Sequence, residues 1–163
     1  MRAHPYSGPL QGVPNLFVHK LDERAKLPTR ANEFAIGWDV HAFLLTETSR
    51  ATSKAVHQRG VTEVRTGIVV QPPEGYYIQV HSRSGLAKKG VFVANAPGII
   101  DPDFSGELIV LLYNGSFETH YVAHEHRIAQ LILCPIQQLQ IAERPPFERL
   151  GGRNTNGWGS TGL

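Results

Sequence analysis

The 163-residue sequence lacks the features that mark membrane, secreted and disulfide-bonded proteins. Its longest apolar runs, Leu108 to Tyr113 and Ile128 to Ile132, are far shorter than the ~20 residues that a membrane-spanning helix needs. The stretch from Met1 to Leu10 has no apolar run of signal-peptide length. A single cysteine, Cys134, excludes an intramolecular disulfide. We therefore expect a soluble, intracellular protein, with cytoplasm and nucleus equally compatible.

Concentrated positive charge is also absent. The chain has 16 basic and 14 acidic residues, no lysine-rich tract, and no alternation of aromatic with basic residues. This composition argues against a nucleic-acid-binding surface. His120, His124 and His126 allow either a metal site or a surface loop, and the lack of a second cluster with ligand spacing favours the loop. Cys134 lies in the apolar run LILCPI, which favours a buried structural role over a nucleophile.

Most of the remaining signals indicate β-structure. Segments 67–70 and 76–80 flank the turn residues PPEG, and the apolar runs LIVLLYN and RIAQLILCPI predict two further strands with both faces covered. Only SGLAKKG, from Ser84, resembles a helix of one or two turns. Short strands separated by Pro and Gly predict an all-β barrel or jelly roll, with one short helix after Arg-Ser-Gly.

Three segments differ from this β-pattern. Residues 1–15 are rich in Pro and Gly and are expected to be irregular, and the polar stretch 46–60 resembles a loop between strands. The glycine-rich end has the composition of a flexible arm. We therefore expect a β-domain over residues 1–148 and a C-terminal arm over residues 149–163.

The segment NAPGIIDPDFSGELIVLLYN, residues 95–114, allows two interpretations. Asp101, Asp103 and Glu107 suit a solvated turn that opens an apolar strand. Alternatively, one carboxylate lies at the edge of a pocket, where it takes a proton from water.

Two further segments have the chemistry of phosphate binding. The C-terminal segment combines glycines with Arg153, Ser160 and Thr161, so backbone N–H groups, hydroxyls and a guanidinium are available to phosphate oxygens. The segment SRSGLAKKG offers Arg83 and Ser84 in the same way. A disordered tail remains the alternative for the C-terminal segment when it is considered alone.

Five segments occur in a fixed order: AIGWDVHA (35–42), SRSGLAKKG (82–90), NAPGIIDPDFSGE (95–107), RIAQL (127–131) and RNTNGWGSTG (153–162). This order and spacing resemble the five motifs of the trimeric dUTP pyrophosphatases, from about residue 15 to the C-terminus. The resemblance implies a jelly-roll-like β-fold and Mg²⁺-dependent hydrolysis of dUTP to dUMP and pyrophosphate. It also implies a homotrimer whose active sites combine several subunits, the arm of one subunit closing over the site of another.

The resemblance also implies roles for individual residues. Asp101 corresponds to the general base, and Asp39 to the residue that holds water ligands of a Mg²⁺ ion bound mainly by the triphosphate. Phe104 occupies the place of a tyrosine that packs against deoxyribose. Substrate-binding positions are implied for Arg83, Ser84, Gly85, Asn95, Gly98, Ile100, Phe104, Gln130, Arg153, Trp158, Gly159, Ser160 and Thr161.

The sequence departs from the family pattern at a few positions, and other functions have to be weighed. Ser82 replaces a proline and Glu125-His126 replace Gly-Asp, which affects turns more than chemistry. Trp158 replaces a phenylalanine and offers a larger stacking surface. The related dCTP deaminases have a catalytic glutamate at the place of Leu111, and leucine cannot relay protons. A ligand-gated binding protein is a further alternative, but intact motifs around Asp101 and in the arm favour an enzyme.

Overall fold

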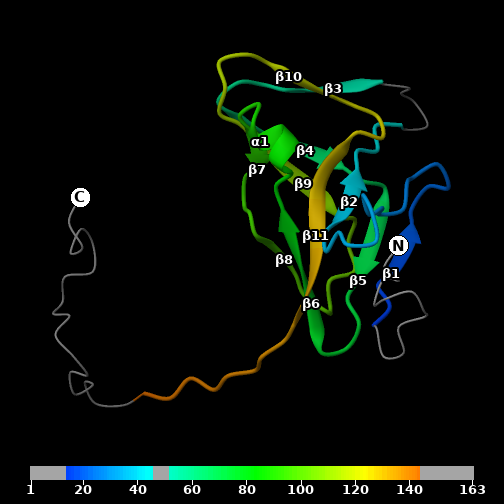
Figure 1. Cartoon of the computed structure of the whole chain (residues 1–163), viewed down its shortest axis with the longest axis vertical. Coiled ribbons are helices and arrows are strands. Elements are labelled where there is room, and N and C mark those ends of the chain that lie inside the picture. Colours follow the sequence, from blue (N-terminus) through cyan, green and yellow to red (C-terminus); the bar gives the residue numbers. More distant parts are fainter. Residues whose placement is uncertain (1–13, 46–51, 144–163) are drawn as a thin grey trace, which may run out of the picture.

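The computed structural model describes residues 14–45 and 52–143, which form short antiparallel strands and one four-residue helix (Figure 1). In order along the chain, the elements are β1 (Phe17–Lys20), β2 (Trp38–His41), β3 (Ser53–Val56), β4 (Gly60–Arg65), β5 (Ile68–Gln71), β6 (Tyr76–His81), α1 (Ser84–Ala87), β7 (Val91–Val93), β8 (Gly98–Ile100), β9 (Ile109–Asn114), β10 (His120–Ala123) and β11 (Arg127–Pro135).

The strands form four sheets, and every pairing is antiparallel. The largest sheet has the order β2-β11-β6-β8, a second has the order β4-β9-β7, and two pairs are formed by β1 with β5 and β3 with β10. Neighbours within the larger sheets are far apart in sequence, as when β11 inserts between β2 and β6. The all-β prediction and the short helix after Arg-Ser-Gly are therefore confirmed.

The two larger sheets share one apolar core. Inward-facing residues alternate with outward-facing ones, so Ile78 and Val80 of β6 are buried with Leu131 of β11, and Val110 and Leu112 of β9 join the same cluster. Burying each such side chain contributes roughly 1.5–3 kcal/mol. The β-branched residues suit this pleated, half-buried surface.

Three expectations from the sequence were wrong in detail. The apolar run of β9 is not covered on both faces in the single chain, because Ile109 is 42% exposed. Cys134 is half-buried rather than buried. Part of segment 46–60 is not a loop, since Ser53–Val56 is strand β3, which pairs with β10.

The C-terminal end of the described chain leaves the β-domain. After β11, residues 136–143 run away from the sheets as an extended segment (orange in Figure 1). Leu139 and Ile141, two residues apart, are both exposed there. Among the described residues, no helix has the length and apolar character to cross a membrane.

Glu125 adopts a backbone conformation that favours glycine. Its φ is 62°, at a turn where its amide donates a hydrogen bond to the carbonyl of Ala42. Its carboxylate lies 3.6 Å from the Lys26 ammonium, an exposed ion pair. Non-glycine residues in this left-handed region cost about 1–2 kcal/mol, whereas an exposed ion pair contributes little.

Glu125→Gly is therefore expected to stabilise the protein by up to about 1 kcal/mol, or a few degrees in Tm. Thermal unfolding followed by circular dichroism measures this change. Glu125→Ala is the matched control, because it removes the same ion pair and keeps the strained Cβ. Equal stabilisation by both substitutions would show that the backbone conformation is not the cause.

Candidate active site

The carboxylates of segment 95–114 lie in the loop between β8 and β9. Strand β8 pairs with β6 through Ile78 and Ile100, and Ile100 is buried. Asp101 follows directly and is exposed, and its carbonyl accepts a hydrogen bond from the amide of Phe104 at 3.1 Å. A rigid strand thus ends at an ionisable side chain that solvent reaches.

Glu107 fixes the other end of this loop. One carboxylate oxygen accepts a 2.8 Å hydrogen bond from the amide of Gly67, and the other accepts one from Arg65 Nε, also at 2.8 Å. Leu108 continues the attachment, because its amide donates to the carbonyl of Ile68 and its own carbonyl accepts from the Thr66 hydroxyl. Glu107 is therefore a structural anchor, which leaves Asp101 and Asp103, both exposed, as the other carboxylates of the segment.

A cavity of about 280 Å³ lies beside the loop. Its wall is mostly apolar, with a few polar groups, which is the usual character of a small-molecule site. Gly98 brings one of these polar groups close, because a Cβ there would lie 3.1 Å from Nδ2 of Asn95. The lining residues are Val80, Asn95, Gly98, Ile99, Ile100, Phe104, Glu107, Leu108 and Ile109.

The ring of Phe104 lies across Gly106. A Cβ at Gly106 would come within 2.9 Å of Phe104 Cζ, closer than side chains approach in proteins. The glycine therefore permits the ring position, and the ring, which is partly exposed, forms one wall of the cavity.

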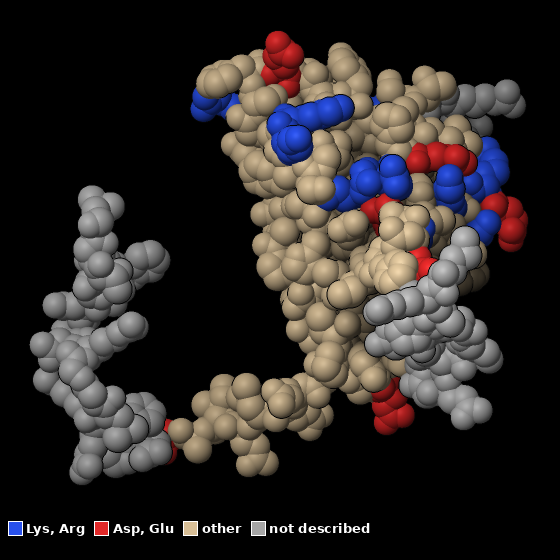
Figure 2. All heavy atoms as spheres, viewed as in Figure 1, with Lys and Arg blue, Asp and Glu red and all other residues tan. Residues whose placement is uncertain are grey.

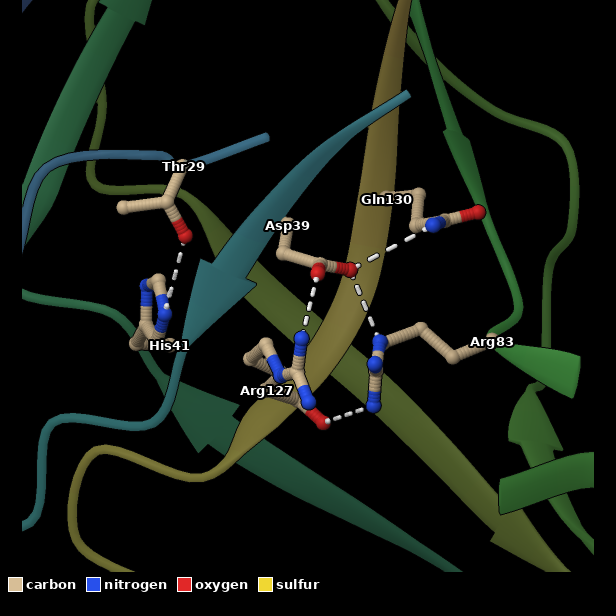
Figure 3. A network of polar contacts seen from close by, with 6 residues as sticks. All are labelled: Thr29, Asp39, His41, Arg83, Arg127 and Gln130. Carbon is tan, nitrogen blue, oxygen red and sulfur yellow. Dashed lines mark hydrogen bonds and ion pairs between the residues drawn. The ribbon is translucent and has the colours of Figure 1, made fainter. Parts of the chain in front are cut away.

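A second group of polar side chains surrounds the buried carboxylate of Asp39 on β2 (Figure 3). Its Oδ1 accepts a 2.7 Å hydrogen bond from Arg83 Nε and a 3.3 Å bond from Gln130 Nε2. Its Oδ2 accepts a 3.3 Å bond from Arg127 Nη1. Arg83 Nη1 also donates to the carbonyl of Arg127 at 3.2 Å. A buried charge requires such partners, and here two guanidiniums supply them.

The backbone around the cluster brings its members together. Asp39 and Gln130 are paired residues of β2 and β11, and a Cβ at Gly37 would lie 3.2 Å from Cδ of the Gln130 side chain. Arg83 lies between β6 and α1, with Ser84 and Gly85 in α1 itself. Ser82, at the family's proline position, accepts a 2.8 Å hydrogen bond from the amide of Val93 and so ties this turn to β7.

His41 lies on β2, two residues after Asp39, in surroundings that favour the neutral imidazole. Burial, assisted by the nearby Lys26 charge, lowers the pKa of His41 below its usual value. Its Nε2 is 3.4 Å from the Thr29 hydroxyl, and its Nδ1 is buried without a hydrogen-bond partner among the described residues. His41 therefore remains neutral beside the two guanidiniums.

The described residues contain no group of three or more His, Cys, Asp or Glu side chains that could hold a metal ion directly. His124 and His126 instead accept hydrogen bonds from the amides of Leu44 and Ala123 through Nδ1. Asp39 has one acceptor position left on Oδ2, since a carboxylate oxygen takes about two hydrogen bonds. The residues present therefore fit a Mg²⁺ ion only if the ion is held by the substrate and reaches Asp39 through water.

The structure groups the candidate residues into two sets. Asn95, Gly98, Ile100 and Phe104 line the cavity, and Asp101 adjoins it. The polar cluster contains Asp39, Arg83 and Gln130, and Ser84 and Gly85 lie next to Arg83 in the chain. The remaining candidates lie outside the described residues: Arg153, Trp158, Gly159, Ser160 and Thr161. Sequence reasoning missed Arg127, although it opens the segment RIAQL, because nothing in the sequence indicates its contact with Asp39.

The two sets lie at different places on one sheet. Asp39 is on β2, whereas Gly98 and Ile100 of the cavity are on β8, and these strands are the two edges of the order β2-β11-β6-β8. The other members of the polar cluster lie between these edges, since Gln130 is on β11 and Arg83 follows β6, which pairs directly with β8.

Comparison with known proteins identifies the family. The dUTPase family model matches residues 23–162. The deoxyuridine 5'-triphosphate nucleotidohydrolase of Hydrogenobaculum sp. (strain Y04AAS1) is 38% identical over 149 residues, which are 91% of this chain and 98% of the relative. That of Chlamydia muridarum is 40% identical over 147 residues, 90% of this chain and 97% of the relative.

Solved structures agree on the fold. A variant of the Staphylococcus bacteriophage 80alpha dUTPase with dUpNHpp has a TM-score of 0.74 and 22% identity, covering 91% of this chain and 99% of that one. A mutant dUTPase from phage phi11 of S. aureus, which shows the coordination of a structural Mg(II) ion, has a TM-score of 0.69 and 22% identity over 83% of this chain and 99% of that one. Since the family model covers most of the sequence and relatives match over nine-tenths of it, the chain belongs to the dUTPase family.

Proposed function

We propose that the protein hydrolyses dUTP to dUMP and pyrophosphate. In a cell, this reaction limits the incorporation of uracil into DNA and supplies dUMP for dTMP synthesis. The observation that carries the proposal is the cavity at the end of β8, which is lined by Asn95, Gly98 and Phe104 and adjoined by Asp101. This is the arrangement expected for a nucleoside site with a general base at its edge.

Asp101 is the proposed base. Its carboxylate takes a proton from a water molecule as the water oxygen attacks the α-phosphorus, and the bond to the bridging oxygen of the β-phosphate breaks. Pyrophosphate leaves with the electron pair of that bond. The exposure of Asp101 at the end of a paired strand supports this role, because solvent reaches the side chain while the backbone is fixed.

The cavity supplies base and sugar selectivity in this proposal. The Asn95 amide and the backbone at Gly98 and Ile100 donate and accept hydrogen bonds with uracil. The ring of Phe104 packs against deoxyribose and leaves no room for a 2′-hydroxyl. The position of that ring over Gly106 supports the assignment.

The cluster around Asp39 is the proposed triphosphate end of the site. Arg83, Ser84, Gly85 and Gln130 contact the phosphates or the attacking water. Mg²⁺, when bound to the triphosphate, offsets the negative charge that opposes attack by water. Asp39 contributes through water at the acceptor position left on Oδ2.

A homotrimer with shared active sites is proposed for the assembly. On the sheet β4-β9-β7, Val61 and Phe92 are both paired with Tyr113 of β9 and both exposed in the single chain, so a second subunit has apolar surface to cover. The arm, residues 149–163, would close over a neighbouring site, with Arg153, Gly159, Ser160 and Thr161 on the γ-phosphate and Trp158 on the base.

The activity is tested with a panel of nucleotides. Purified protein is incubated separately with dUTP, dTTP, dCTP and UTP, with and without Mg²⁺, and products are separated by chromatography. We expect dUMP and pyrophosphate from dUTP, strong preference over the other three, and much slower reaction without Mg²⁺. Comparable turnover of dCTP, or release of ammonia from it, would contradict the uracil assignment.

Asp101→Asn is expected to retain dUTP binding and lose most hydrolysis, because the amide keeps the shape but cannot accept a proton. Loss of a general base costs about 10²–10⁴ in rate. Single-turnover rates and the Kd of a non-hydrolysable dUTP analogue measure the two effects separately. Asp103→Asn is the matched control and should remain active. Near wild-type turnover of Asp101→Asn would require a different base.

Shared sites predict complementation between inactive subunits. Asp101→Asn and a variant lacking residues 150–163 should each be inactive and trimeric by light scattering. After co-refolding, mixed trimers should recover activity, because some sites combine an intact Asp101 from one subunit with an intact arm from another. A mixture of Asp101→Asn with the variant carrying both changes is the control and should stay inactive. Mixed trimers without recovered activity would show that sites are not shared in this way.

A further inference from the structure

One ionisable side chain, that of Glu107, lies in the wall of the cavity at the end of β8. It is only 14% exposed, so its charge needs partners. Each carboxylate oxygen has one at 2.8 Å, the amide of Gly67 for Oε1 and Nε of Arg65 for Oε2. The amide has no net charge, so the guanidinium of Arg65 is the group that neutralises Glu107.

Arg65 reaches this carboxylate from the second sheet. On the face shown in Figure 2, Lys and Arg side chains gather over α1 and β2, whereas the surface over β8 carries almost no charge. Arg65 is instead the last residue of β4, where it pairs with Ile109 of β9. Its carbonyl also accepts a 2.8 Å hydrogen bond from the amide of Phe43. The backbone at Arg65 is thus held on two sides and gives Glu107 a fixed point of attachment.

Residues 101–106 depend on this point because little else holds them. All are exposed, and among the described residues their only hydrogen bond joins the amide of Phe104 to the carbonyl of Asp101, within the loop itself. The loop is attached at its two ends, by the pairing of β8 with β6 and by Glu107 and Leu108. A segment with few buried contacts takes its conformation from such attachments, and Glu107 is the one next to the loop.

We propose that Arg65 is a positioning residue: by holding the carboxylate of Glu107, it fixes the loop and thereby the place of the Asp101 carboxylate beside the bound nucleotide. The proposal rests on the proposed function for the role of Asp101. The Arg65 side chain is 48% exposed, and ion pairs with an exposed partner contribute little to stability. The effect lies in geometry instead, because a displacement of about 1 Å can lower a catalytic rate about 100-fold.

The test compares Arg65→Gln and Arg65→Lys with Arg24→Gln, which removes an arginine of similar exposure, 50%, from an ion pair with Asp22. Hydrogen exchange at the amides of Gly67 and Phe104 reports the attachment and the order of the loop without substrate. Single-turnover rates with dUTP and Mg²⁺, and the Kd of a non-hydrolysable dUTP analogue, separate chemistry from binding. Circular dichroism checks the fold and gives Tm.

We expect Arg65→Gln to speed exchange at both amides and to lower the single-turnover rate roughly tenfold or more, with a smaller change in Kd. Arg65→Lys should recover part of the rate, because an ammonium can still bind Glu107. Arg24→Gln should leave exchange, rate and Kd unchanged. A variant carrying both Arg65→Gln and Glu107→Gln should be about as slow as Glu107→Gln alone, because the two side chains act as one unit.

A folded Arg65→Gln protein with a wild-type single-turnover rate would overturn the proposal, even with a lower Tm, because the ion pair would then support only the fold. Effects that multiply in the double variant would overturn it as well, by showing that Arg65 does not act through Glu107. If Arg65→Gln does not fold, Glu107→Gln decides the question, and a wild-type rate there rejects the proposal. Faster exchange in Arg65→Gln, in a protein whose wild type does not hydrolyse dUTP, would support the positioning of the loop and reject the proposed function.

Discussion

The buried carboxylate of Asp39 constrains the arrangement of the whole polar half of the site. An unpaired buried charge costs several kcal/mol, so β2 can place Asp39 beneath the surface only where donors meet it. Those donors come from β11, through Gln130 and Arg127, and from the turn after β6, through Arg83. Pairing of β2 and β6 on either side of β11 brings these segments together, although 44 and 88 residues of chain separate Asp39 from its two arginines.

The apolar half depends on a different pair of anchors. Strand β8 has only three residues and lies at the edge of its sheet, so β6 alone would hold the cavity wall weakly. Glu107 compensates by binding Arg65 and the amide of Gly67, and thereby attaches the far end of the loop to the turn between β4 and β5. Asp101 lies between these two attachments. Its backbone position is therefore set on both sides, while its exposed side chain forms no hydrogen bond or ion pair with the described residues.

The sequence predicted the parts of this structure that local chemistry determines. Apolar runs with turn residues between them located β5, β6, β9 and β11, and the motif order grouped Asn95, Gly98 and Phe104, which line one cavity. Strand β3 was missed because Ser53–Val56 is half polar, and its pairing with β10 joins segments about 65 residues apart, which no local pattern reports. The sequence also predicted that both faces of β9 are buried, which the single chain does not show. A continuous apolar run does not distinguish a buried face from an exposed one.

Two departures from the family pattern, at Ser82 and Phe104, fall where a neighbouring group takes over the structural role of the usual residue. Ser82, in place of a proline, holds its turn by accepting a hydrogen bond from the amide of Val93 rather than by a fixed φ. Phe104 lacks the hydroxyl of the usual tyrosine, yet its ring position is set by the space over Gly106, and that space does not depend on the hydroxyl. Glu125 is different, because among the described residues its side chain forms only an exposed ion pair with Lys26, which does little to offset a left-handed φ of 62°. The first two replacements lie beside the proposed nucleotide site and are structurally compensated. The third lies in a turn ahead of β11, where the fold tolerates strain of about 1–2 kcal/mol.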